Sequence, residues 1–358
     1  MSKPSGAIDM TQGKPINLML RFALPMMIGS IFQSLYSMVD SAVLGRFVGS
    51  HALAAIGATT STTGLILLLA TGVTSAISIV LSQYVGANDT DRVRKGIVAS
   101  GWITLLLGVV LGLISVFAAR PLMQLLKTPE DVIDMSVLYI QIVCGCGIAQ
   151  FAYNAAASIL RALGDSKTPL YFLILCSILN VILDLISVIG LNMGVAGVAV
   201  ATVGSQAISA AICILVMFRK YPDLMPKRHT LRPDMPVSLK IFGMGAQMAL
   251  QSLFLSVGMM VITRVINSYG SNVVAAFTVG SNVQNLAVML FSNFSFGFSV
   301  YVGQNFGARL YDRMKKSINI CLAMSAGTTL LLSFILIAVA RPLLELFSDD
   351  AQVIEIGL

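Results

Sequence analysis

Residues 169–190 read PLYFLILCSILNVILDLISVIG, an apolar run long enough to cross a bilayer as a helix. Asn180 and Asp184 lie four positions apart in it, so both side chains project from one face of that helix. An ionisable group at membrane depth is expensive, and by default it marks a pathway for ions, protons or substrate. The alternative is that Asp184 lies at a helix end.

The composition is that of a membrane protein. Of the 358 residues, 56% are hydrophobic and only 11% are charged, and the mean hydropathy is +0.87. A soluble domain is usually near a quarter charged. Apolar runs of about 20 residues recur along the chain, which predicts an all-α polytopic membrane protein and excludes a barrel of short alternating strands. Residues 1–14 are polar, so we expect no secretory signal peptide.

Nine complete spans can be drawn. They cover residues 17–45, 52–82, 97–119, 135–160, 169–190, 194–218, 238–266, 273–302 and 316–340, and a tenth begins near Val353. With the N-terminus and every second loop on one side of the membrane, that side carries 18 of the 23 Lys and Arg residues. The positive-inside rule therefore predicts a cell (inner) membrane protein with a cytoplasmic N-terminus. It also explains the net charge of +7 without a nucleic-acid partner.

An internal repeat predicts two lobes. At a constant offset of 221 residues, Gln83-x-x-Gly86-Ala87 matches Gln304-x-x-Gly307-Ala308. Further matched pairs are Gly49-Ser50 with Gly270-Ser271, Ala54-Ala55 with Ala275-Ala276, Asp91-Arg92 with Asp312-Arg313, and Arg120-Pro121 with Arg341-Pro342. Six spans lie between the repeat starts, so the two copies run parallel about an axis along the membrane normal. We predict an N-terminal lobe at 1–219, a proline-rich cytoplasmic linker at 220–237 and a C-terminal lobe at 238–358.

Extending the repeat predicts a twelve-helix plan in two six-helix lobes. Leu358 corresponds to Val137, inside the fourth span of the first half. A second half would then need roughly 80 further residues. We therefore expect this chain to hold helices 7 to 9 and the start of helix 10 of an incomplete second lobe.

The carboxylates single out one region of the membrane. Of the 16 acidic residues, only Asp40 and Asp184 lie within spans. Neither has a basic partner at membrane depth, so each would take up a proton or bind a cation, or the two would act as protonated interhelical contacts. Other polar side chains at span depth in this half could pack between helices or supply oxygen ligands for a hard cation; they are Gln33, Ser34, Tyr36, Asn154, Ser177 and Thr202.

Other classes of function find little support. The two histidines, His51 and His229, fall in predicted loops, and no phosphate-binding G-x-x-x-x-G-K-[ST] sequence occurs. We therefore expect no enzyme, no ATP-driven engine and no cofactor. The five cysteines (Cys144, Cys146, Cys176, Cys213 and Cys321) are predicted to be small core residues.

Several stretches together resemble the multidrug and toxic compound extrusion (MATE) family. They are Leu24-Pro25 with residues 36–40 (YSMVD) and Gly45, residues 82–87 (SQYVGA), residues 159–169 (ILRALGDSKTP), and residues 194–197 (GVAG) with Ala201-Thr202. The resemblance extends over the length of the chain. It implies two six-helix lobes that expel organic cations and other amphipathic compounds in exchange for H+ or Na+.

The resemblance also implies roles for individual residues. Asp40 matches the helix-one aspartate of members whose ion site lies in the N-terminal lobe, and Asn180 and Asp184 match their helix-five pair. Asn154 and Thr202 match supporting residues on helices four and six, and Na+, if it is the coupling ion, would bind at Asp40, Asn180 and Asp184. Substrate would meet Gln33, Tyr36 and Ser177, and helix one would bend at Pro25. Residues 248–256 lack the glutamate of members with a C-terminal-lobe site.

The predicted function is therefore an antiporter, expected to act as a monomer in the lipid bilayer on small organic cations or drugs. A second interpretation keeps the two lobes but exports lipid-linked or polysaccharide precursors, which several arginines at span depth would favour. A lipid-acting membrane enzyme would need a metal cluster or a nucleophile–base pair in the spans. A non-transporting fragment is the remaining alternative.

Overall fold

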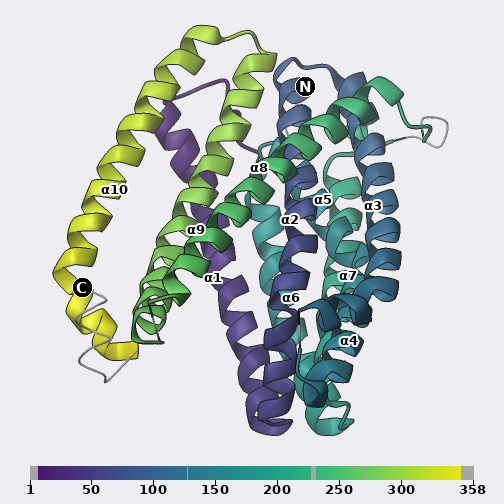
Figure 1. Cartoon of the computed structure of the whole chain (residues 1–358). Coiled ribbons are helices and arrows are strands. Elements are labelled where there is room, and N and C mark those ends of the chain that lie inside the picture. The colour runs from purple at the N-terminus through teal and green to yellow at the C-terminus, as the bar shows by residue number, and fades with distance from the viewer. Residues whose placement is uncertain (1–6, 127, 227–230, 270, 348–358) are drawn as a thin grey trace.

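The computed structural model describes residues 7–126, 128–226, 231–269 and 271–347, and within these ranges every regular element is a helix (Figure 1). The elements are α1 (Pro15–Phe47), α2 (Ser50–Gly86), α3 (Thr90–Leu125), α4 (Glu130–Gly145), α5 (Ile148–Ala162), α6 (Lys167–Asp184), the π-helix η1 (Leu185–Gly190), α7 (Gly194–Lys220), the short 3-10 turn η2 (Pro222–Leu224), α8 (Met235–Asn267), α9 (Ser271–Gly307) and α10 (Tyr311–Phe347).

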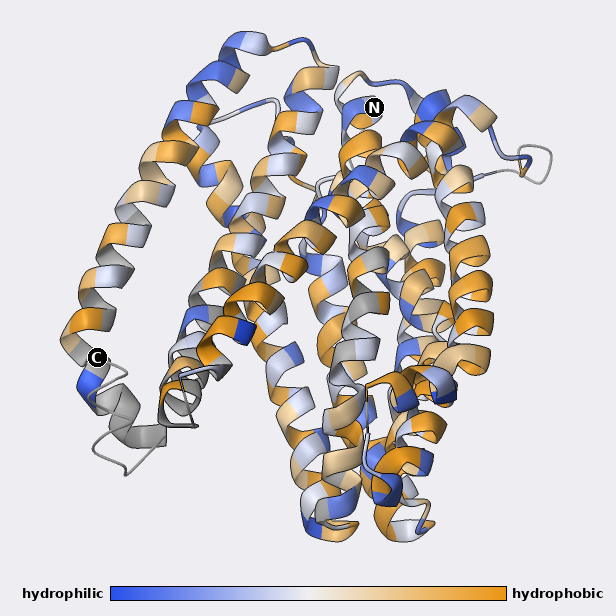
Figure 2. Ribbon diagram, in the orientation of Figure 1, coloured by the Kyte–Doolittle hydropathy of each residue, from blue (hydrophilic) through white to orange (hydrophobic). Residues whose placement is uncertain are grey.

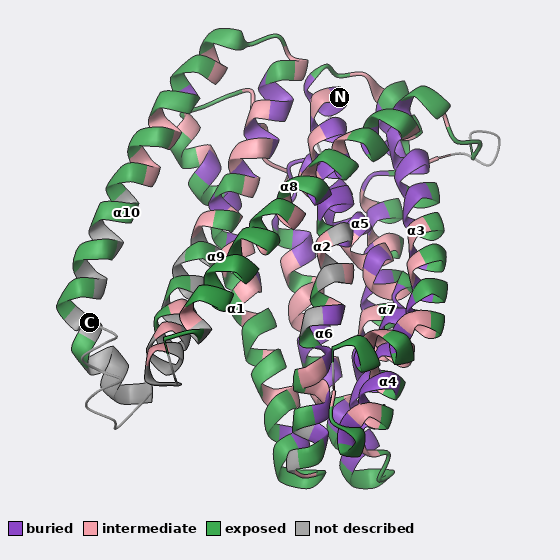
Figure 3. Ribbon diagram, in the orientation of Figure 1, coloured by how far each residue is buried: buried purple, intermediate pink, exposed green. Residues whose placement is uncertain are grey.

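The helices have the length and surface of membrane spans. Within the described residues, five of them are long and apolar enough to cross a bilayer, and six if α4 and α5 count as one bent span. Hydrophobic residues line α3 in Figure 2, and Figure 3 shows that its outward face is exposed. Phe117 there is 78% exposed, which suits contact with lipid. The predicted all-α polytopic architecture is confirmed, and the tenth span lies outside the described residues.

The fourth predicted span is broken, whereas the sequence predicted one continuous helix. Helices α4 and α5 meet at an angle of 43°. Gly145 lies at this break, and α3 packs closely against it, because a Cβ on Gly112 would lie 2.8 Å from the Gly145 carbonyl oxygen. Close backbone approach through glycine therefore accompanies the bend.

The fifth predicted span is continuous but changes pitch. The α-helical geometry of α6 ends at Asp184, and the chain continues as a π-helix to Gly190. Asp184 thus lies inside the span Lys167–Gly190 and not at a helix end, which removes that alternative. Short π-helical segments inside helices occur frequently at functional sites.

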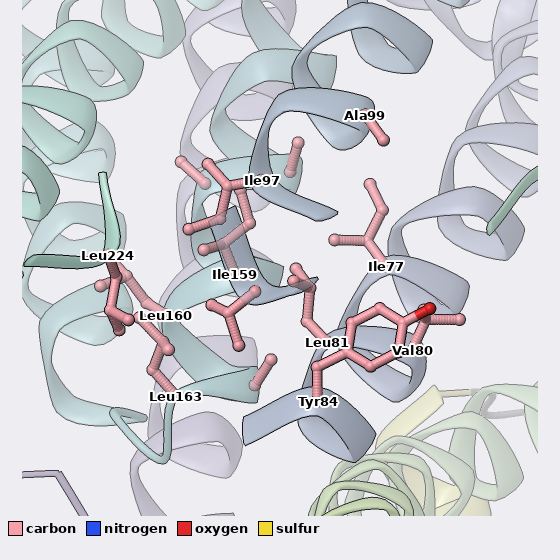
Figure 4. Close-up of a cluster of buried hydrophobic side chains, with 14 of the residues drawn as sticks. Ile77, Val80, Leu81, Tyr84, Ile97, Ala99, Ile159, Leu160, Leu163 and Leu224 are labelled. Carbon is pink, nitrogen blue, oxygen red and sulfur yellow. The ribbon is translucent and has the colours of Figure 1, made fainter. Parts of the chain in front are cut away.

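The main core joins α2, α3, α5, α7 and the start of α8, and Figure 4 shows part of it. Ile77 and Leu81 from α2 pack against Ile97 from α3 and Leu160 from α5. Because lipid tails are as apolar as these side chains, close packing and dispersion, more than removal from water, hold such helices together. Of the cysteines predicted to be core residues, Cys144, Cys176 and Cys213 are buried, but Cys146 is exposed and Cys321 is only half-buried.

A buried ion pair fixes the start of α6 to the end of α7. Asp165 is fully buried and accepts hydrogen bonds from Lys220 Nζ at 2.6 Å, Thr168 Oγ1 at 2.6 Å and Tyr221 OH at 3.2 Å. Burial and the neighbouring Asp165 carboxylate raise the pKa of Tyr221, so its hydroxyl stays a donor. The sequence placed Asp165 among loop acids, and the structure shows that it is a structural anchor.

The repeat is visible as reciprocal contacts between α2 and α9. A Cβ on Gly86 would collide with the carbonyl oxygen of Gln304, and a Cβ on Gly307 would collide with that of Gln83. Gly86 is equivalent to Gly307 in the 221-residue repeat, and Gln83 is equivalent to Gln304. Each helix therefore makes the same contact with the other, as expected for helices related by a twofold axis. Between them, Gly303 faces its own equivalent, Ser82. These contacts lie at the end of the bundle that carries Arg92, Lys95, Lys220 and Arg313, which we call the basic end.

The segment Ile8–Gly13 crosses the basic end and joins the two groups of helices. The Ile8 amide donates to the Gly164 carbonyl at 2.9 Å, and the Met10 amide donates to Gln304 Oε1 at 3.2 Å. Asn305 Nδ2 donates to the Met10 carbonyl at 2.9 Å. Figure 1 shows that α1 crosses α9 and continues to the opposite end of the molecule. The basic end thus helps to hold the first seven helices and α8–α10 together, in addition to the close contact of Gly72 on α2 with Gly245 and Ala249 on α8.

Gly86→Ala should destabilise the protein. The new methyl group must push α2 away from the Gln304 backbone, which we expect to cost about 1–3 kcal/mol. Gly101→Ala on α3 is the matched control, because no atom lies within 4 Å of its added Cβ, and it should leave stability unchanged or raise it slightly. Thermal unfolding in detergent measures both. Equal unfolding midpoints for the two variants would contradict the close α2–α9 contact.

Candidate functional site

Asp40 on α1 and Asp184 on α6 lie next to each other inside the first group of helices. Their carboxyl groups interact directly. Both oxygens of Asp184, Oδ1 of Asp40 and Oδ1 of Asn180 are buried, and none of the four has a hydrogen-bond donor among the described residues. The predicted meeting of helix one with the helix-five pair is thus present in the structure.

Three further side chains surround this pair. Asn180 Nδ2 donates to Thr202 Oγ1 on α7 at 3.5 Å. Tyr36 and Tyr139 are close enough to Asp40 to interact with it electrostatically. Tyr139, on α4, was not predicted, because nothing in its place within the predicted span 135–160 distinguishes it from a packing residue.

A cavity of about 120 Å³ lies beside the carboxylate pair. Of the residues predicted from the resemblance, Gln33, Tyr36, Asn154 and Pro25 line it. Ser177 is not among the lining residues, and its hydroxyl donates to the Leu173 carbonyl within α6 at 2.9 Å. The volume is below the roughly 300 Å³ of a typical small-molecule pocket, so the cavity can hold part of an organic molecule.

The cavity wall also contains polar residues outside the predicted site. Gln150 and Tyr153 on α5, Gln206 on α7 and Asn293 on α9 are among them. Asn293 Nδ2 donates to Ser30 Oγ at 2.8 Å, so α9 reaches the cavity from the second group of helices. Gln247 and Gln251 on α8, in contrast, are exposed.

The structure places Arg161 differently from the sequence prediction. It was counted among the basic residues outside the membrane, with no arginine expected at span depth. The structure places it in the last turn of α5 and in the wall of the cavity. One arginine in the described cavity wall falls short of the several that would favour export of lipid-linked precursors. His51, expected in a loop, lies in the first turn of α2 and is exposed.

Two adjacent carboxyl groups without donors require a cation. Two ionised carboxylates cannot share such a site unless a proton or a metal ion lies between them. The four unpartnered oxygens could receive a proton, which would bridge Asp40 and Asp184, or a hard cation such as Na+, which oxygen ligands suit. The arrangement can therefore bind and release a cation reversibly.

Comparisons with known proteins identify the family and agree with the fold. The MatE family model matches residues 25–186 and 248–358. The probable multidrug resistance protein YpnP of Bacillus subtilis (strain 168) is 31% identical over 303 residues, which cover 84% of this chain and 67% of the relative. YoeA, a second probable multidrug resistance protein of that organism, is 28% identical over 345 residues, covering 94% of this chain and 74% of the relative.

A solved structure has the same fold. It is described as the outward-facing conformation of a multidrug resistance MATE family transporter of the MOP superfamily. The TM-score is 0.90 at 22% sequence identity, covering 100% of this chain and 80% of that one.

Asp184→Asn and Asp165→Asn should change stability in opposite directions. The amide at position 184 would supply a donor beside Asp40, relieving a buried unpartnered acceptor, so stability should rise by about 1–3 kcal/mol. Asp165→Asn removes the partner of Lys220, and stability should fall by about 3 kcal/mol, the lower end for a buried pair because Lys220 keeps access to water.

Unfolding midpoints in detergent at neutral pH, without sodium, measure both changes. A lower midpoint for Asp184→Asn would mean that its carboxyl has a stabilising partner and would contradict the description of the site.

Proposed function

The chain belongs to the MatE family, and we propose that it is a secondary antiporter that exports organic cations and other amphipathic compounds in exchange for H+ or Na+. Family membership makes it a membrane transporter and not an enzyme. The relatives that are named multidrug resistance proteins support drug-like cargo. The observation that carries the coupling is the unpartnered Asp40–Asp184 pair inside the helix bundle.

Coupling follows when ion and substrate favour different states of the protein. An ion at Asp40 and Asp184 neutralises the buried acceptors and stabilises the packing of α1 on α6, whereas substrate in the neighbouring cavity occupies space between the same helices. Each ligand shifts the conformational equilibrium only by its difference in affinity for the two states. Substrate release on one side and ion release on the other then drive the cycle.

We further propose how the molecule lies in the cell membrane. The basic end faces the cytoplasm, since that end holds most of the lysines and arginines. The first lobe comprises residues 1–219, the linker 220–237 and the second lobe 238–358, and the protein acts as a monomer. In the conformation described, the Gly86 and Gly307 contacts close the cytoplasmic side, and they must separate to admit cargo.

Helix α1 is the proposed moving element. Pro25 lies within it and lacks the amide hydrogen that would bond the preceding turn. It also lines the cavity, so bending there would change the cavity and move Asp40 relative to α6. The α-helix is continuous through Pro25 in this conformation.

Asp184→Asn should abolish substrate export while leaving membrane insertion intact, because the remaining carboxyl can no longer share an ion. Reconstituted proteoliposomes with a fluorescent organic cation and imposed ion gradients measure export. Asp134→Asn is the matched control, since that exposed carboxylate pairs only with Arg120 at the surface, and it should retain full rates. Undiminished export by Asp184→Asn would refute the assignment.

A proton gradient and a sodium gradient, imposed separately, distinguish the coupling ions. The protein should respond to one of them, and the response should disappear in the Asp184→Asn variant. Export that continues with both gradients collapsed would contradict antiport.

Pro25→Ala should slow transport, because the restored hydrogen bond from residue 25 to residue 21 stiffens α1. We expect the maximal rate to fall about tenfold, roughly 1.4 kcal/mol, with a smaller change in substrate affinity. Rates and equilibrium binding, measured on the same preparation, separate the two effects. A change in affinity alone would assign Pro25 to the cavity wall and not to a hinge.

A further inference from the structure

We propose that the cavity beside the ion site binds a carboxylate group of the cargo, with Arg161 as its cationic partner. This inference rests on the proposed function only in treating the bound molecule as cargo. It adds a substrate class, amphipathic molecules that carry a carboxylate, and a residue that selects it.

The charge of Arg161 has no acidic partner. Its Nη2 donates to Ser158 Oγ at 3.0 Å, and its guanidinium carbon lies 4.8 Å from the centre of the Phe296 ring. Its Nε is buried and has no acceptor, and no salt bridge among the described residues includes it. Arg161 as a whole is half-buried, and a partly buried charge without a counter-ion is costly, so its free Nε–H group is suited to an incoming anion.

A second unpartnered group lines the same end of the cavity. Ser166 is 3% exposed, and its hydroxyl has no hydrogen-bond partner. It is the N-cap residue of α6, whose N-terminus contributes positive potential. The nearby carboxylate of Asp165 is already paired with Lys220 and bonded by Thr168 and Tyr221.

The rest of the described wall favours an anion over a cation. Arg161 is the one charged residue among those that line the cavity, and most of the other polar groups are amides and hydroxyls, which can either donate or accept; the amides are Gln33, Gln150, Asn154, Gln206 and Asn293. A cationic group would meet one positive charge and no acidic side chain there, so the cationic part of an exported compound would lie outside this small cavity. Arginine is also the side chain best matched to a planar carboxylate.

The size of the cavity limits what enters it. About 120 Å³ accommodates roughly four waters at the volume each takes in the liquid, so it holds one end of a molecule. Leu170, Leu173 and Pro169 form an apolar part of the wall, against which an attached ring or chain can pack.

Three isosteric probes test the charge preference: benzoate, neutral benzamide and cationic benzamidinium. Saturation-transfer NMR on the detergent-solubilised chain measures their binding. We expect benzoate to bind at least tenfold more tightly than benzamide, with benzamidinium weakest. Equal affinities for benzoate and benzamide, or tighter binding of benzamidinium, would overturn the proposal.

Variants assign the preference to this site. Arg161→Gln should weaken benzoate at least tenfold and leave benzamide unchanged, Arg161→Lys should lose less, and Ser166→Ala should weaken benzoate two- to fivefold. Arg120→Gln, an exposed arginine paired with Asp134, is the matched control and should bind like the unaltered chain. Unchanged benzoate binding by Arg161→Gln would overturn the proposal.

Asn154→Asp keeps the test decisive if Arg161→Gln fails to fold. The added carboxylate in the same wall should abolish benzoate binding and admit benzamidinium, and retained benzoate binding would count against the site. Binding is measured without any gradient, so the two proposals fail separately. Carboxylate binding without ion-driven export would refute the antiport mechanism alone, and export without carboxylate binding would refute this inference alone.

Discussion

A bilayer interior contains no water to satisfy a polar group, so each donor and acceptor must find its partner within the protein. Most side-chain hydroxyls in the spans find a partner by donating a hydrogen bond to the backbone carbonyl one turn earlier in the same helix, as Ser37, Thr74 and Ser100 do. The carboxylates outside the spans comply through ion pairs, of which the buried Asp165–Lys220 pair is the most enclosed. Against this background the few buried groups without partners stand out.

Five of the residues with unpartnered buried groups gather in two places within the first half of the molecule, and the others are single hydroxyls elsewhere. Asp40, Asn180 and Asp184 present acceptors without donors, and Arg161 and Ser166 present donor groups without acceptors. Tyr36 belongs to both neighbourhoods, because it interacts with Asp40 and lines the cavity that also contains Arg161. This half of the molecule therefore has one group of acceptors that attracts a cation and, near it, one group of donors that attracts an anion. Ion and cargo can occupy these neighbouring places.

The fold could be predicted well from the sequence, because apolar runs and the 221-residue repeat depend on composition and register alone. The site was predicted in part. Asp40 and Asp184 were found because acids at membrane depth are rare, but Arg161 lies near a span end, where basic residues are common. Tyr139 and Gln206 carry no signal of their own, since only helix packing decides what they face. The bend between α4 and α5 and the π-helix after Asp184 depend on tertiary contacts, which periodicity does not record.

The contact between Gly303 and Ser82 has a consequence for the symmetry of the molecule. A residue on a twofold axis faces its own counterpart. A side chain that fills the space between the two positions therefore leaves no room for a second one. A Cβ on Gly303 would occupy the space of the Ser82 hydroxyl. Serine opposite glycine fits at this spacing, whereas serine at both equivalent positions would not. A chain with serine in both halves would have to hold α2 and α9 further apart.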